Sequence, residues 1–392
     1  MDLELSEIEQ LVQKTARDYA RKVLLPAAAE IDRHERFPYQ ELRGLAALDL
    51  LAVGVPTEYG GAGAGALAYA LAMQEIAYGC ASTAVTMAVN NMVGEVIAHF
   101  GSEEQRQHYC PKLARAFVRD GDPDDAVRFG CFALSEPDAG SDPGGMSTTA
   151  VLDGDEWVIH GAKQWITSGG HAGVFVVWAR SEDRASAPGT RGLSAFLVPG
   201  ETPGIRVGRA EDKMGLRGSN TVPLEFDEVR VPKSALLGVR GGGFKIAMMA
   251  LDGGRIGIAS QALGIARAAL DESVQYAKDR AQFDQPIASF QGIQWKLADM
   301  KTQLDAANWL ALRAASQKAR GRSFSREASM AKLYATETAW RIAQSAVQIH
   351  GGYGYTREFA AERHLRDVRV TMIYEGTSEV QRLVVARTVL SE

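Results

Sequence analysis

The sequence predicts an α+β protein of three parts: an N-terminal α-helical domain over residues 1–120, a middle antiparallel β domain over residues 121–236, and a C-terminal four-helix bundle over residues 237–392. Apolar residues recur every three or four positions in the first and last thirds, which indicates helices. In the middle they alternate between glycines and prolines, which indicates strands. A chain of 392 residues also exceeds one ordinary core, so several domains are expected.

The first part is predicted to be a series of helices. Ser6 and Glu9 have the spacing of a capping box, and Pro26 is expected to interrupt or kink the helix that begins there. Further helices are expected over Leu42–Leu51, Leu67–Tyr78, Thr83–Phe100 and Glu103–Phe117.

The content of glycine, proline and polar residues predicts two connecting segments. The glycines of Gly60–Gly65 do not fit the register of a dinucleotide-binding loop, and no strand pattern precedes them, so we interpret this segment as a connection between helices. The polar segment Asp120–Arg128 predicts an exposed linker into the β domain.

The middle part is predicted from short alternating runs. Asp153-Gly154, within Val151–Ile159, is a turn signal that predicts a β-hairpin. Further strands are expected at Val174–Ala179, at Leu193–Leu197, and over Val222–Phe226 and Val229–Val231.

Helices are expected to return after Gly241-Gly242-Gly243. Three seams of apolar or small residues step by three and four along the chain, and a fourth begins at Val380. Helices of comparable length with such seams predict a four-helix bundle. The three long seams are Leu263–Ala277, Phe290–Ala314 and Ala328–Ile349.

Composition excludes several classes of protein. The formal net charge is −5, and no basic run is interleaved with aromatic residues, which argues against nucleic-acid binding. Cys80, Cys110 and Cys131 are too few and too far apart for a disulfide framework or a zinc site, and no metal site is expected. A signal-peptide pattern and a membrane-spanning run are both missing from the sequence, so a cytoplasmic location is expected.

The segment from Arg366 to Thr377 is the most informative for function. It places the carboxylate of Glu375 between Tyr374 and Gly376, after apolar residues. A carboxylate among apolar side chains has a raised pKa, which suits a general base. Taken alone, the same residues favour a simpler interpretation, in which Glu375 is a turn residue ahead of a helix capped by Thr377 or Ser378.

Two segments of the β domain carry a second signal. Cys131–Asp142 is rich in serine, glycine and exposed backbone amides, which can hold the polar edge of a ring, although its residues are also turn formers. In Trp157–Thr167, Trp165 can stack on a flat cofactor while Thr167 donates a hydrogen bond. The alternative for Trp165 alone is a core residue of a strand.

Together these segments resemble the acyl-CoA dehydrogenase family, in order and over nearly the whole chain. The sequence from Phe244 to Gly264 most resembles the short-chain, butyryl-type branch of the family. The matching stretches are Ala133–Asp142, Trp165–Thr167, Lys213–Ser219, Asp252–Ala259, Gln348–Gly354 and Ile373–Thr377.

The resemblance implies that FAD lies between the β domain and the bundle. Some contacts would come from the chain itself and others from a neighbouring subunit of a homotetramer, a dimer of dimers. The own-chain residues would be Phe132, Leu134, Ser135, Gly140, Ser141, Trp165, Ile166, Thr167, Thr377 and Glu379. The residues contributed across the interface would be Arg280, Phe290, Gln291, Gln348, Gly351 and Gly352.

The resemblance also implies the reaction. Glu375 would remove the α-proton of a short-chain acyl-CoA, a hydride would pass to the flavin, and electrons would go on to an electron-transfer flavoprotein. The isovaleryl-type branch carries its base in the stretch that matches Asp252–Arg255, where this chain has Gly254, so Glu375 is the base at a family position. The residues implied to line the substrate site are Ser141, Asp252, Arg255, Tyr374 and Gly376.

Some alternatives stay open. Arg255 also suits a buried, ion-paired structural residue, and Ser168 stands where the family often has asparagine, which leaves contacts at the flavin edge undecided. Branched, cyclic, biosynthetic or carrier-protein-bound thioesters remain possible substrates. A flavin monooxygenase of the same fold is argued against by Glu375, which such an enzyme does not need. A non-enzymatic assembly protein is the third alternative.

Overall fold

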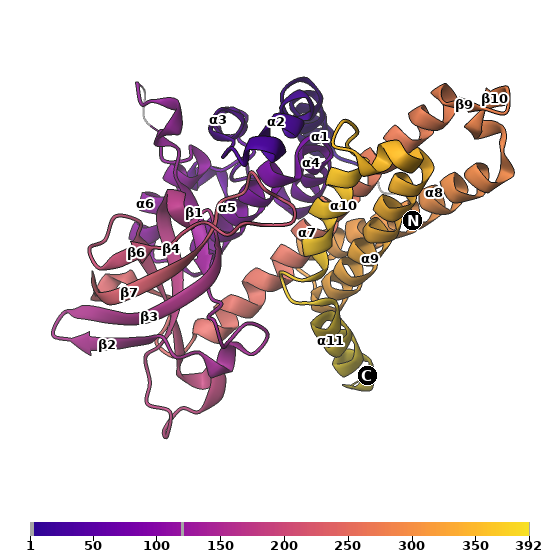
Figure 1. Ribbon diagram of the computed structural model, residues 1–392. Helices are drawn as coiled ribbons and strands as arrows, with labels where there is room; N and C mark the ends of the chain where they lie inside the picture. The colour runs from indigo at the N-terminus through magenta and orange to yellow at the C-terminus, as the bar shows by residue number, and fades with distance from the viewer. Residues whose placement is uncertain (1–3, 119–120, 392) are drawn as a thin grey trace.

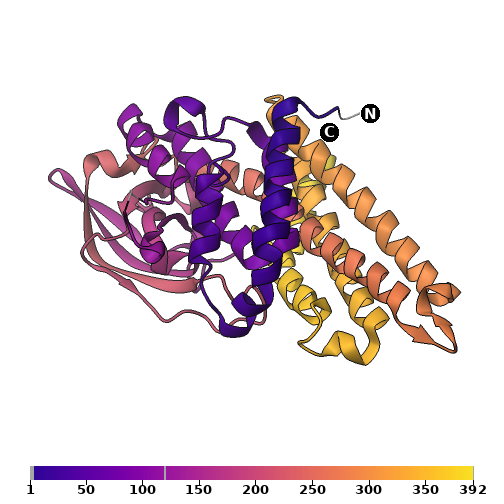
Figure 2. The ribbon, with the colours of Figure 1, turned by 90° about the horizontal axis from the view of Figure 1, so that it is seen from above.

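The computed structural model describes residues 4–118 and 121–391. It places the three predicted parts along one axis, with the N-terminal helices between the sheet and the C-terminal helices (Figures 1 and 2). The predicted fold class is confirmed. Residues 119 and 120, which belong to the predicted linker and to the first domain boundary, lie outside the described residues.

The N-terminal part contains the predicted helices. Ser6 and Glu9 form the predicted capping box at the start of the first helix. The glycine-rich segment connects the 3₁₀ helix η2 (Thr57–Tyr59) to α4, as expected. The helices are α1 (Glu7–Tyr19), α2 (Leu25–His34), α3 (Tyr39–Ala47), α4 (Gly65–Gly79), α5 (Ala81–Phe100) and α6 (Glu103–Ala114).

Two details of this part differ from the prediction. The chain stays helical through Pro26, because a π-helical turn, Ala20–Leu24, joins α1 to α2 and leaves the proline in the first turn of α2, where it is tolerated. The helix predicted over 42–51 begins and ends earlier, since Asp49 has a left-handed backbone with φ of 56°.

The middle part is one eight-stranded sheet in the order β6-β7-β3-β2-β4-β5-β8, with β1 paired to β4. The predicted hairpin at Gly154 is confirmed, and it joins β2 to β3. Pairing is mainly antiparallel, but β1 runs parallel to β4, which the alternating pattern did not reveal. The strands are β1 (Phe129–Ala133), β2 (Thr149–Asp153), β3 (Glu156–Thr167), β4 (Ala172–Arg180), β5 (Leu193–Pro199), β6 (Ile205–Val207), β7 (Thr221–Pro232) and β8 (Leu236–Leu237).

The C-terminal part contains three long helices and two shorter ones. The fourth helix of the bundle, α11, has 14 residues against 37 in α7, so the expectation of comparable lengths is wrong. An additional short helix, α10, precedes it. The bounds are α7 (Gly243–Asp279), α8 (Gln291–Ala319), α9 (Ser325–His350), α10 (Ala361–Arg369) and α11 (Ser378–Ser391).

Helix α7 connects the parts physically. Its 37 residues extend about 55 Å at 1.5 Å per residue, from the sheet to the far tip of the molecule, where β9 (Ala281–Gln282) and β10 (Gln285–Pro286) form a small hairpin (Figure 1). Alanines of α7, α8 and α9 share one core with Leu67 and Leu71 of α4. The middle of α7 is therefore buried between the N-terminal helices and the bundle.

Within the described ranges, no helix is long and apolar enough to cross a bilayer. The same residues contain no cluster of His, Cys, Asp and Glu that could hold a metal ion. All three cysteines are buried and unpaired.

Candidate active site

Glu375 lies in a strained loop between α10 and α11. Its φ is 54° and that of Gly376 is 84°, so two successive residues are left-handed. Such a backbone is uncommon for a residue with a side chain and concentrates at functional sites. The Thr377 hydroxyl accepts a hydrogen bond from Val380 N–H at 3.3 Å and caps α11, so the structural interpretation of Thr377 also holds.

Side chains from two helices hold this loop by its carbonyls. Gln381 Nε2 donates to Glu375 O at 3.0 Å and to Gly376 O at 2.8 Å. Lys332 Nζ, from α9, donates to Gly376 O at 2.7 Å. The backbone N–H of Glu375 donates to no group of the described chain. It is therefore free to bind an incoming oxygen atom.

Glu375 is half-buried, and the Oε2 atom of its carboxylate is buried. Its Oε2 atom has no hydrogen-bond partner among the described residues. Burial raises the pKa of Glu375 to about 7, and the charges of Arg255 and Lys332 oppose that rise. A carboxylate with a pKa near neutrality and a free oxygen suits proton abstraction.

Gly254 of α7 lies directly against this carboxylate. A Cβ added to Gly254 would be 2.6 Å from Glu375 Oε2 and 2.9 Å from its Cδ. Contacts under 3.0 Å do not occur between real atoms of this kind, so glycine leaves the space that Glu375 occupies. The position where the isovaleryl-type branch is expected to carry its base is thus adjacent to the carboxylate of Glu375.

Asp252 and Arg255 form a buried ion pair beside the loop. Arg255 is 4% exposed and donates to Asp252 and, at 3.2 Å, to Ser329 Oγ of α9. Asp252 also accepts a hydrogen bond from Ser325 Oγ at 2.9 Å. These contacts support the structural interpretation of Arg255, which in addition places a positive charge near Glu375.

Tyr374 does not direct its hydroxyl into the loop. That hydroxyl donates to Gln261 Oε1 of α7, and burial raises the pKa of the phenol. Tyr374 thereby anchors the chain just before Glu375.

Three neighbours of Glu375 were not singled out by the motifs: Tyr69, Lys332 and Gln381. The Tyr69 hydroxyl would lie 2.5 Å from a Cβ at Gly257, one turn along α7 from Gly254. Burial raises the pKa of Tyr69, and Glu375 adds to that rise. Lys332 carried a usable signal, since it is a lysine within an alanine-rich, buried helical seam.

The segment predicted to stack on a flat ring is exposed and strained. Trp165 is 61% exposed and has a φ of 64°. The β3–β7 register shifts between Lys163 and Ile166, which turns Trp165 out while Ile166 is buried and Thr167 pairs with Thr221. An exposed tryptophan on an irregular strand fits stacking on a cofactor better than the core interpretation.

The segment after β1 lies alongside Trp165. Ser135 O accepts a hydrogen bond from Gln164 N at 2.9 Å, and Leu134 O accepts one from Lys163 Nζ at 3.2 Å. Lys163 also pairs with buried Glu136 at 2.8 Å. These bonds fix the segment to β3.

Phe132, Gly140 and Ser141 complete this segment. Phe132 is partly buried and packs against Trp178, with 4.3 Å between ring centroids. Gly140 and Ser141 are exposed, and a Cβ at Gly140 would meet nothing within 4 Å. Polar backbone is therefore accessible on this side of Trp165.

The second group of expected cofactor residues lies elsewhere. Arg280 ends α7, and its guanidinium lies 5.6 Å from the Tyr353 ring centroid, beside the turn that follows α9. Phe290 is the N-cap of α8, Gln291 is its first residue, and Gln348 lies in the last turn of α9. Within one chain the end of α7 lies beside the β9–β10 tip of the molecule, away from β3 (Figure 1). The structure thus does not bring the two groups together in a single subunit.

The glycines of the second group leave room for a ligand. Gly351 has a φ of 59°, which favours glycine, and a Cβ at Gly351 or Gly352 would meet nothing within 4 Å. Backbone at this turn is therefore open to close approach.

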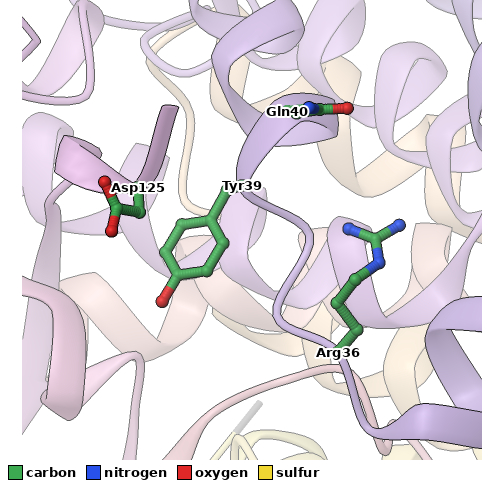
Figure 3. Close-up of a pocket in the computed structure, with 4 residues that line it drawn as sticks. All are labelled: Arg36, Tyr39, Gln40 and Asp125. Carbon is green, nitrogen blue, oxygen red and sulfur yellow. The ribbon is translucent and has the colours of Figure 1, made fainter. Parts of the chain in front are cut away.

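Two cavities lie apart from the Glu375 loop. One of about 470 Å³ is lined by Arg36, Tyr39, Gln40 and Asp125, and Figure 3 shows the Tyr39 ring projecting between Arg36 and Asp125. The other, of about 530 Å³, lies along β3, β6 and β7. Neither is lined by Glu375.

Family models match most of the chain. The N-terminal domain of the acyl-CoA dehydrogenases matches residues 6–116, the middle domain residues 131–229, and the C-terminal domain residues 241–390. Together with the strained carboxylate loop and the exposed tryptophan, these matches define an oxidoreductase of the flavoprotein class. The chain belongs to the acyl-CoA dehydrogenase family, whose members depend on FAD.

Individual members of the family show how similar this chain is to known proteins. The human mitochondrial short-chain specific acyl-CoA dehydrogenase is 51% identical over 386 residues, which are 98% of this chain and 90% of that protein. Butyryl-CoA dehydrogenase from Megasphaera elsdenii superposes with a TM-score of 0.94 at 40% identity, covering all of both chains. A chain from a structural study of the electron transferring flavoprotein of Acidaminococcus fermentans has a TM-score of 0.95 at 41% identity, again over all of both chains.

Proposed function

We propose that the chain dehydrogenates a short-chain acyl-CoA to the trans-2-enoyl-CoA, with Glu375 as the base that removes the α-proton. The observation that carries this proposal is the buried Oε2 atom of Glu375, which has no partner and belongs to a carboxyl with a pKa near 7. A buried carboxylate oxygen without a hydrogen-bond partner is free to accept a proton when the carboxyl group is ionised.

The loop backbone supports the same step. As the α-proton leaves, negative charge develops on the thioester oxygen. The free N–H of Glu375 is the donor that we assign to this oxygen, and its orientation is fixed because Gln381 and Lys332 hold the adjoining carbonyls. Loss of such a donor typically costs roughly 3–4 kcal/mol of transition-state stabilisation.

Bound FAD would supply the acceptor for the hydride that leaves the β-carbon. Trp165 and Thr167 of β3, with Leu134–Ser141, would hold the ring portion. The exposure of Trp165 and the open backbone at Gly140 fit this role. The own-chain residues Thr377 and Glu379 lie at the start of α11, next to Glu375.

We infer that the remaining cofactor contacts come from a second copy of the chain in a homotetramer. The end of α7, where Arg280 contacts Tyr353, is remote from β3 in one chain (Figure 1), so a neighbouring subunit would bring both groups to one FAD. Arg280 suits the pyrophosphate because its guanidinium is planar and permanently charged. Analytical ultracentrifugation of the FAD-bound protein tests this assembly.

The preference for a short acyl group and the identity of the electron acceptor are inferred from similar proteins. A short-chain enzyme and a butyryl-CoA dehydrogenase are among the similar proteins, and one similar chain comes from a study of an electron transferring flavoprotein. We propose butyryl-CoA as a substrate and an electron-transfer flavoprotein as the acceptor. A cytoplasmic location stays a prediction for cell fractionation.

Anaerobic titration tests the proposed reaction. The purified yellow protein is mixed with acyl-CoAs of increasing length, and flavin bleaching is followed. Bleaching by butyryl-CoA and loss of bleaching in Glu375→Gln are expected. A preference for branched or cyclic thioesters would correct the substrate class, and failure of every thioester to bleach a FAD-loaded protein would refute the activity.

A further inference from the structure

Lys332 is a fully buried lysine whose ammonium group contacts the loop Tyr374–Thr377 that carries Glu375, called here the base loop. It lies in the first third of α9, next to Ala331 and one turn before Ala335, and its relative exposure is 0%. Its Nζ atom donates to Gly376 O at 2.7 Å. The described residues provide no ion pair to this nitrogen. A buried ammonium is costly in free energy, so a lysine kept here for packing alone would be a poor choice.

The charged groups that act on the pKa of Lys332 come from four parts of the chain. Glu375 is on the base loop, Glu379 on α11, Glu337 on α9 and Arg255 on α7. Burial lowers the pKa of Lys332 to about 7, while Glu375 is the largest influence in the opposite direction. The positive charges of Arg255 and Lys332 in turn lower the pKa of Glu375. Lys332 and Glu375 are therefore coupled without a direct hydrogen bond.

Arg255 and Lys332 differ in what else they bind. Arg255 is neutralised locally by Asp252. Lys332 instead gives its hydrogen bond to the carbonyl that follows Glu375 in the chain. The same carbonyl also accepts a hydrogen bond from Gln381. It belongs to Gly376, the second of the two successive left-handed residues. Lys332 thus combines an electrostatic and a mechanical contact with the base.

We propose that Lys332 is a positioning residue that fixes the base loop through Gly376 O and favours the ionised form of Glu375. This inference rests on the proposed function for the catalytic meaning of an ionised Glu375. The placement of the loop and the charge coupling do not depend on which substrate is used. A neutral residue at 332 leaves Glu375 protonated to higher pH, and a neutral residue without a donor also leaves Gly376 O with Gln381 as its remaining donor.

The test compares Lys332→Met with Lys332→Gln in the full-length, FAD-loaded protein. Met removes both the charge and the donor, whereas Gln keeps an N–H donor without charge. Lys233→Met, at a half-exposed lysine paired with Asp155 in the β domain, is the control. Difference infrared spectroscopy follows the carboxylic-acid band of Glu375 against pH, with Glu375→Gln as the baseline. Flavin bleaching by butyryl-CoA gives kcat and KM over the same pH range.

In both variants the midpoint of the Glu375 band is expected to move upward by about one pH unit. The plateau of kcat in Lys332→Met is expected to fall on the order of 10- to 100-fold with little change in KM, because the base is displaced. Lys332→Gln should recover part of that plateau while it keeps the shifted midpoint.

An unchanged infrared midpoint in Lys332→Met, with FAD still bound, overturns the proposal. If that variant does not fold, the midpoint in Lys332→Gln decides in the same way. If no acyl-CoA bleaches the flavin of the native protein, the proposed function is refuted instead. The infrared titration would still test whether Lys332 favours the ionised form of Glu375.

Discussion

The carboxylate of Glu375 occupies the space that a side chain on Gly254 would need. The two residues are 121 positions apart in the sequence, yet a Cβ on Gly254 would be 2.6 Å from Glu375 Oε2. The carboxylate of Glu375 therefore lies against the surface of α7, and the absence of a side chain at Gly254 is a condition for its placement.

Gly254→Ala is expected to displace the base. The added methyl group clashes with Glu375, so kcat should fall by about 100-fold, as for a misplacement of roughly 1 Å. Alanine in a helix interior otherwise stabilises by about 0.5–1 kcal/mol relative to glycine. Stopped-flow flavin reduction measures the loss.

Gly253→Ala is the matched comparison, because its nearest neighbour is the flexible end of Lys318 at 3.0 Å. Its kcat should fall much less than that of Gly254→Ala. Equal losses in the two variants would show that the space beside Glu375 is not the cause.

The pH dependence of the reaction should report Glu375. Burial raises the pKa of this carboxyl to about 7, and the ionised form is the one that accepts the proton. The value of kcat/KM should therefore decrease about tenfold for each pH unit below 7 and level off above it. Steady-state rates with butyryl-CoA between pH 5 and 9 check this. A flat profile through pH 7 would exclude Glu375 as the titrating base.

The same carboxyl should make stability depend on pH. The folded pKa of about 7 lies above the ordinary value of 4.5, so the folded protein retains a proton that the unfolded chain releases. The stabilisation is fully present below about pH 4.5 and is lost as the pH rises through 7. Glu375→Gln stays neutral, so its Tm relative to the native protein should increase between pH 5 and pH 8. Exposed Glu201→Gln should show no such increase.

Trp165 should be required to retain FAD. Its exposed ring on a strained strand is explained by stacking, so Trp165→Ala should weaken FAD binding by about 1–3 kcal/mol, the range for stacking on an aromatic side chain. Fluorescence titration of the apoprotein with FAD measures the affinity. Val151→Ala, at a similarly exposed position of β2, should bind as the native protein does. Unchanged affinity in Trp165→Ala would return Trp165 to a purely structural role.

Local sequence patterns predicted the helices, strands and turns better than they predicted how these elements pair and pack. The capping box at Ser6 and the hairpin at Gly154 depend on residues close in sequence, and both predictions are confirmed. The parallel pairing of β1 with β4 depends on a long connection, for which alternation carries no information. The length of α11 was overestimated because its apolar residues were only a short start of a pattern.

The site shows the same limit. Glu375 was found because a motif of neighbouring residues surrounds it. Lys332 and Tyr69 are 43 and 306 positions away, and nothing local shows that their polar atoms turn towards the base. A lysine in a buried alanine seam indicates a partner, but only the packing of α9 against the base loop identifies that partner as Gly376.

The buried pair of Glu136 and Lys163 should control the stability of the segment beside Trp165. Both side chains are at most 3% exposed, and their charged atoms are 2.8 Å apart. Lys163 depresses the pKa of Glu136 to about 2, so the pair is ionised at neutral pH. Glu136→Gln leaves the Lys163 ammonium without its counter-charge and should lower the free energy of unfolding by about 3–5 kcal/mol. The double variant Glu136→Gln/Lys163→Met removes that stranded charge, so it should be more stable than Glu136→Gln alone. Urea denaturation of the three proteins measures the differences, and a double variant no more stable than the single one would show that the hydrogen bonds of Glu136 to Ser147 and Thr148, rather than its charge, hold the segment in place.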